Sequence, residues 1–187
     1  NKPITVNAQA DGNLSSLHLR QLNSELPGAF RINVSGDGES LTDSIRRSGE
    51  VRLSAETENL DFVLDLLPPA QKELFRIPNL KLTGEATLAN QEYHTDLLLT
   101  QGQGKVKVAA GYHPLKEIYT AELTVDSLEP IHFMPKDSLL WLTAAISIEG
   151  KGFKPFSSKT TATINGKISD IQYGHSSITD VTLDGTL

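Results

Sequence analysis

The sequence predicts an all-β fold. We expect an elongated, mostly antiparallel sheet built from repeated β units, with one or two short helices. Three observations predict it: apolar and polar residues alternate along most of the chain, the connections between these runs are short, and few segments could form helices. Short connections indicate antiparallel neighbours, because parallel strands need a crossover of a dozen or more residues.

Period-two alternation is clearest in residues 4–10, 30–34, 51–56, 106–112 and 119–125. Successive side chains of a strand point to opposite faces, so each run indicates a strand with one apolar and one solvated face. Counting all such runs gives about eleven strands.

Segments rich in Gly, Asn and other turn formers lie between these runs, and we expect them to be hairpin connections. They are residues 11–13, 35–40, 89–91, 101–104 and 165–167. Gly84 interrupts the alternation of "LKLTGEATL" (residues 80–88), which predicts a bend of the sheet there.

Helical signals are sparse. Residues 68–75, "PPAQKELF", begin with prolines suited to a first turn and continue with good helix formers. Residues 39–47 predict a second short helix or an irregular edge strand. Residues 129–135 predict a turn or a short 3₁₀ segment.

The same type of phrase recurs along the chain: apolar residues two apart, then Gly, at 32–36, 80–84 and 146–150. We interpret this as a single repeat-built domain of three divergent units, spanning approximately 1–60, 61–127 and 128–187. The alternative is a meander that produces such phrases by chance. Because the sequence begins without Met or a signal peptide, we interpret it as a fragment of a longer chain.

Composition excludes several functions. A net charge of −6 without a basic stripe argues against nucleic acid as a partner. There is no cysteine, and the five histidines are scattered singly, so we expect no metal and no cofactor. No catalytic motif is present, and we expect a protein that is not an enzyme. The longest apolar run, residues 139–148, is too short to cross a bilayer, which takes about 20 residues.

The apolar face remains as the candidate site. About ten strands at about 4.8 Å spacing make a sheet roughly 45–50 Å wide, and the few helices cannot cover it. The sheet must close on itself or stay open to an apolar guest. The candidate groove residues are Ile32, Val34, Val51, Leu53, Leu80, Leu82, Leu97, Leu99, Val106, Val108, Ile146 and Ile148. The alternative for each is a place in an ordinary packed core.

The phrases "LKLTGEATL" (80–88), "LTVDSLEPI" (123–131), "ISIEGKGF" (146–153) and "ITDVTLDGTL" (178–187) resemble the repeats of the TamB and AsmA-like envelope proteins of diderm bacteria, in the style of a Bacteroidetes member. The resemblance extends from about residue 28 to 187 and rests on degenerate β phrases.

This resemblance implies a periplasmic protein anchored in the inner membrane through a region outside this fragment. It also implies that the sheet is curved and forms an open groove or taco (half-pipe). This hydrophobic β-groove would bind lipid acyl chains, for phospholipid transfer between the inner and outer membranes and for outer-membrane biogenesis. A further implied partner is an outer-membrane barrel-assembly protein, as in a translocation and assembly module, bound through regions outside the fragment.

Two other classes stay open. One is a closed β-sandwich binding or adhesion module of a bacterial surface protein, although Trp141 is the single tryptophan and aromatics total 6 %, which is few for a sugar-stacking platform. The other is a hydrolase built on a β scaffold.

Overall fold

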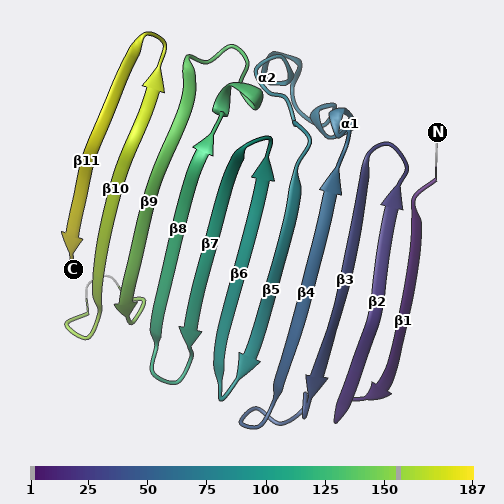
Figure 1. The fold of residues 1–187 in the computed structure, drawn as a ribbon. Coiled ribbons are helices and arrows are strands. Elements are labelled where there is room, and N and C mark those ends of the chain that lie inside the picture. Colours follow the sequence, from purple (N-terminus) through teal and green to yellow (C-terminus); the bar gives the residue numbers. More distant parts are fainter. Residues whose placement is uncertain (1–2, 155–156) are drawn as a thin grey trace.

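The computed structural model describes residues 3–154 and 157–187. Eleven strands form one sheet, in which each strand pairs antiparallel with the next strand along the chain (Figure 1). The strands are β1 (Thr5–Asn13), β2 (Ser16–Leu26), β3 (Phe30–Glu39), β4 (Ser48–Thr57), β5 (Lys81–Ala89), β6 (Glu92–Gln101), β7 (Gly104–His113), β8 (Ile118–Leu128), β9 (Leu139–Lys151), β10 (Thr161–Tyr173) and β11 (Ser176–Thr186). The predicted elongated, open, antiparallel sheet is confirmed.

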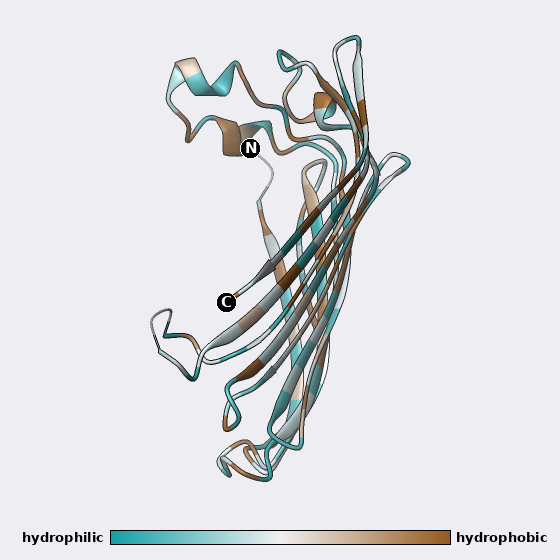
Figure 2. Ribbon diagram, turned by 90° about the vertical axis from the view of Figure 1, so that its left-hand side faces the viewer, coloured by the Kyte–Doolittle hydropathy of each residue, from teal (hydrophilic) through white to brown (hydrophobic). Residues whose placement is uncertain are grey.

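The sheet has two free edges. Within the described residues, β1 pairs only with β2, and β11 pairs only with β10. Figure 2 shows the sheet nearly edge-on as a single layer, with the helical connection projecting to one side at one end. The described sheet therefore stays open along both edges.

Short helices occupy the two longer connections. α1 (Asp61–Leu64) and α2 (Pro69–Lys72) lie between β4 and β5, and the 3₁₀ helix η1 (Pro130–His132) lies between β8 and β9. The helix expected in residues 68–75 and the 3₁₀ segment expected in residues 129–135 are thus present, whereas α1 was not predicted.

The two longer connections meet at one end of the sheet (Figure 1). The Arg76 amide donates to the Phe133 carbonyl at 2.8 Å, and the Lys136 ammonium lies 3.2 Å from the Glu73 carboxylate. These connections fall at the predicted unit boundaries near residues 60 and 128, while the repeat itself stays a prediction.

The prediction for residues 39–47 was wrong. Glu39 ends β3, and residues 40–47 form turns and bends that are neither a helix nor an edge strand. The Asp43 carboxylate accepts hydrogen bonds from the Ile45 amide at 2.9 Å and from the Arg46 amide at 3.0 Å. An Asp that bonds the backbone two and three residues on favours such a turn over a continuing helix.

Three of the glycine-based turn predictions also need correction. Residues 11–13 end β1, residues 35–39 belong to β3, and residues 165–167 lie in the middle of β10. Gly36 pairs with Val51, and Gly166 pairs with both Ile146 and Leu183, so the sheet ladder holds these segments extended. Residues 89–91 and 101–104 do form hairpin turns, with positive φ at Asn90, Gln91 and Gly102.

The predicted bend at Gly84 is not seen in the pairing. The register runs without a shift from Leu53 through Gly84 to Leu97. A Cβ at residue 84 would collide with the Leu97 side chain, so Gly84 makes room for a cross-strand neighbour. Register shifts occur elsewhere, for example between Leu19 and Leu22.

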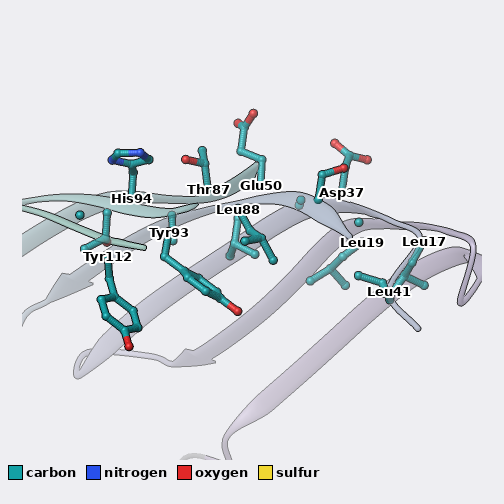
Figure 3. A pocket seen from close by; sticks show the side chains of 18 of the residues that line it. Leu17, Leu19, Asp37, Leu41, Glu50, Thr87, Leu88, Tyr93, His94 and Tyr112 are labelled. Carbon is teal, nitrogen blue, oxygen red and sulfur yellow. The ribbon is translucent and has the colours of Figure 1, made fainter. Parts of the chain in front are cut away.

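The two faces of the sheet differ in chemistry. Figure 3 shows Leu17, Leu19, Leu88, Tyr93 and Tyr112 on one face, which we call the apolar face. Asp37, Glu50, Thr87 and His94 point to the other, which we call the polar face. Because residues paired across antiparallel strands share a face, these assignments extend along every register that contains them.

The sheet has almost no core. Among the described residues, the buried apolar side chains are Ala29, Leu64 and Val125. The accessible surface is 12562 Å², whereas a compact monomer of 20.3 kDa exposes about 8,800 Å². A single layer cannot bury its own apolar face, so the excess area reflects a face that nothing in the described structure covers.

Candidate functional site

The apolar face consists of four rows of residues that run across the strands. Each row joins residues that pair from strand to strand, starting at β3. The first row is Ile32, Ala55, Leu82, Leu99, Val106 and Val125. The second row is Val34, Leu53, Gly84, Leu97, Val108, Leu123 and Ile146.

The remaining two rows lie nearer the end of the sheet opposite the helices. The third row is Gly36, Val51, Ala86, Thr95, Ala110, Ala121 and Ile148. The fourth row is Gly38, Gly49, Leu88, Tyr93, Tyr112, Tyr119 and Gly150. No charged residue interrupts any of the four.

The twelve candidate residues from the sequence share this face. Eleven of them belong to the first three rows. Leu80 precedes β5 by one residue, and its amide donates to the Thr57 hydroxyl at 2.9 Å while its carbonyl accepts from the Thr57 amide at 2.9 Å. Alternation therefore selected side chains that the fold brings together.

None of the twelve is buried. Ten are half-buried, and Val51 and Ile146 are exposed, at 46 % and 40 %. An ordinary core would bury such residues under a second layer. The eleven strands form one sheet, so within the described residues neither that core nor the closed sandwich of the competing hypothesis is present.

The polar face carries cross-strand ion pairs. Lys81 lies 2.9 Å from Glu56, and Arg52 lies 3.5 Å from Glu85. The hydrogen bond from Lys81, with its positive charge, lowers the pKa of Glu56. Exposed ion pairs of this kind add little stability, but their charged side chains are well solvated. The polar face is therefore suited to contact with water. The exposure of the apolar face still needs an explanation.

The apolar face carries a hollow near one end of the sheet. The hollow has a volume of about 570 Å³ and lies over the ends of β2 to β7 (Figure 3). This volume is within the range of small-molecule pockets, which is about 300–1,000 Å³. Its depth comes from small residues of the third and fourth rows, which are Gly36, Gly38, Gly49, Ala86 and Ala110.

Larger side chains form the walls of the hollow. Leu17, Leu19 and Leu41 stand on one side, and Tyr93 and Tyr112 stand on the other (Figure 3). The sequence-based site included Val51 from this region but missed these five. Alternation alone identified the face, whereas the depth depends on which glycines the register places side by side.

Aromatic rings border the fourth row. Phe153, in the connection after β9, stacks on Tyr119 with ring centroids 5.0 Å apart and meets Tyr112 edge-on at 5.6 Å. Offset-stacked and edge-to-face contacts of this kind are favourable. The connection at residues 152–154 is thereby held against the apolar face.

The histidine–carboxylate contacts are dispersed. His18 lies 2.6 Å from Asp37, His132 lies 2.5 Å from Glu129, and His94 lies 3.6 Å from Glu92. Across residues 3–154 and 157–187, no three His, Asp or Glu residues are grouped so as to hold a metal ion. In the same residues, no helix has the length and apolar character to cross a membrane.

Comparison of the chain with protein families, curated proteins and solved structures gives no match. The functional argument therefore rests on the geometry of the apolar face.

Proposed function

We propose that this chain is a periplasmic segment of a TamB/AsmA-like envelope protein and that its apolar face carries phospholipid acyl chains between the inner and outer membranes. One observation carries the proposal: four adjacent rows of uncharged, mostly apolar residues cross the sheet and are left uncovered. The resemblance of the β phrases to that family adds the cellular setting and the role in outer-membrane biogenesis.

The physical chemistry of the face suits a chain that slides. Removing a methylene from water is worth about 0.8 kcal/mol, and a chain lying on an open face buries about one side of each methylene, which gives roughly 0.4 kcal/mol. Val, Ile and Leu side chains add no directional bonds. A lipid chain on this face would gain affinity in proportion to its length and would meet no fixed stopping point along the first two rows.

Val106 and Val108 provide the test, because they lie on neighbouring rows of one strand. The variant Val106→Asp with Val108→Asp places two carboxylates on the apolar face. The matched control is Lys107→Asp, which lies between them on the polar face and changes the net charge by the same two units. Each purified protein is first incubated with phospholipid vesicles. It is then extracted with organic solvent, and the extracted lipid is quantified by mass spectrometry.

We expect the wild type and Lys107→Asp to retain lipid and the double variant to lose it while keeping a cooperative unfolding transition. The proposal fails if the wild type retains no lipid or if the double variant retains as much as the wild type. Global unfolding of the double variant alone would indicate a packed core in solution, since an unpaired charge is costly only when it is buried, and would also overturn the proposal.

A further inference from the structure

The hollow over β2 to β7 is closed at one rim by the connection between β3 and β4, residues 40–47. The Ser40 and Leu41 amides donate to the Ser15 and Leu14 carbonyls at 2.8 and 2.9 Å, which fixes the start of the connection to the β1–β2 hairpin. Leu41 then covers Gly38, where an added Cβ would lie 2.9 Å from a Leu41 methyl carbon. The rim is thus a defined part of the hollow.

Asp43 organises the rest of this connection. Besides the Ile45 and Arg46 amides, it accepts a hydrogen bond from the Arg46 guanidinium at 2.7 Å, and its carbonyl accepts from the Arg47 amide at 2.9 Å. Bonds from the Arg46 side chain and from both amides lower the pKa of Asp43 to about 2. The carboxylate is therefore charged at neutral pH and keeps the chain leading into Arg47 in one conformation.

Arg47 lies on the apolar side of the sheet. Its guanidinium donates to the Tyr93 hydroxyl at 2.9 Å, and Tyr93 is one wall of the hollow. Arg47 is half-buried, and within residues 3–154 and 157–187 it has no carboxylate within 4.0 Å. Arg31 and Arg46 each have one, and Arg52 has two.

The charges around Arg47 favour an anion. Asp37 and Glu50, the two acidic residues that line the hollow, point to the polar face (Figure 3). An arginine presents five N–H donors, of which Tyr93 uses one, and a guanidinium matches a carboxylate or phosphate in shape. A cation beside an apolar hollow is the arrangement that an amphiphile with an anionic head would fit.

We propose that the hollow seats the end of an anionic amphiphile, with its carboxylate or phosphate head at Arg47 and the Tyr93 hydroxyl and its chain over Val51 and Leu88. This inference rests on the proposed function. It adds a fixed position for the head group to an apolar face that otherwise offers no directional bonds. The head would receive charge-assisted hydrogen bonds, which are stronger than those between neutral groups.

Three probes separate the head from the chain: dodecanoate, dodecanol and acetate, each titrated into the protein by calorimetry. The variants are Arg47→Gln and Arg47→Lys. The control is Arg52→Gln, which removes an arginine from the polar face of β4, the strand that follows Arg47. Thermal unfolding of each variant verifies that the fold is retained.

We expect Arg47→Gln to weaken dodecanoate binding about tenfold, which is the loss of roughly one charged hydrogen bond. Dodecanol binding should be unchanged, Arg47→Lys should fall between the wild type and Arg47→Gln, and Arg52→Gln should behave as the wild type. Acetate should not bind measurably at the concentration that saturates with dodecanoate.

The inference is overturned if dodecanoate affinity is the same in Arg47→Gln and the wild type, or if Arg52→Gln weakens it equally. Acetate binding as tight as that of dodecanoate would instead indicate a site for a free anion and would also overturn it. If dodecanol binds to the wild type, any of these results overturns only this inference and leaves the proposed function standing. If the wild type binds neither dodecanoate nor dodecanol, the proposed function itself fails.

Discussion

Gly84 and Leu97 face each other across β5 and β6, and the Leu97 side chain occupies the space where a Cβ of residue 84 would stand. Gly166 has the same place in the second row, between Ile146 and Leu183, but an added Cβ there would meet only ordinary contacts, the nearest at 3.4 Å from the Leu183 Cβ. Two glycines in one row therefore have different reasons to be glycine.

Gly84→Ala and Gly166→Ala are expected to change the free energy of unfolding in opposite directions. At Gly166 the alanine removes an entropic penalty of strand glycine, worth about 0.5 kcal/mol, so the free energy of unfolding rises. At Gly84 the overlap with Leu97 costs about 1 kcal/mol or more, which exceeds that gain. Urea denaturation of both variants measures the difference, and equal stabilisation by both would show that Leu97 is free to move aside.

Phe153 is expected to hold the connection after β9 against the fourth row. Phe153→Ala removes the stacking on Tyr119 and the edge contact with Tyr112, which together contribute about 1 kcal/mol or more. The expected result is a lower free energy of unfolding and a tyrosine ring that is more accessible to a fluorescence quencher. Leu115→Ala, in the exposed connection after β7, is the control and should change neither property. An unaltered Tyr119 environment in Phe153→Ala would contradict the prediction.

The connection at residues 40–47 should respond to acid through Asp43. The pKa of this group is lowered from 3.8 to about 2, chiefly by its hydrogen bond with the Arg46 side chain. A lowered pKa in the folded state means that the stabilisation is complete above about pH 3.8 and is lost as the pH falls through about 2. A carboxyl NMR titration measures this pKa directly.

The matched variant Asp43→Asn cannot ionise. It should be less stable than the wild type at neutral pH, and the two should converge as the pH falls through about 2. A titration midpoint near 3.8 in the folded protein would show that Arg46 and the two amides do not hold the Asp43 carboxylate.

The strands and their shared face could be predicted because alternation is a local property. Residues that pair across a hairpin lie on the same face of the sheet. The apolar residues of runs such as 51–56 and 106–112 therefore come to lie on one face, whatever the exact turn between the strands. This is why Val51, Leu53, Val106 and Val108 lie on one face.

What the sequence could not supply depends on alignment between strands. Gly36 and Gly166 resemble turn residues locally, yet both lie mid-ladder, because glycine marks a tight approach as readily as a turn. The hollow exists since Gly38 and Gly49 come side by side in one register, and no single strand contains that information. Arg47 likewise meets Tyr93 through a connection whose course Asp43 sets.

The order of the strands in the sheet is the order of the strands in the chain. Each new strand finds its partner in the segment just before it, so assembly needs only the closing of successive short loops, except at the two longer connections. Such a sheet can form strand by strand, starting from whichever hairpin folds first. It can do so while the rest of the chain is still emerging from a ribosome or a translocation pore. Opening would run the same way in reverse, since a strand lost from either edge leaves the remaining ladder intact.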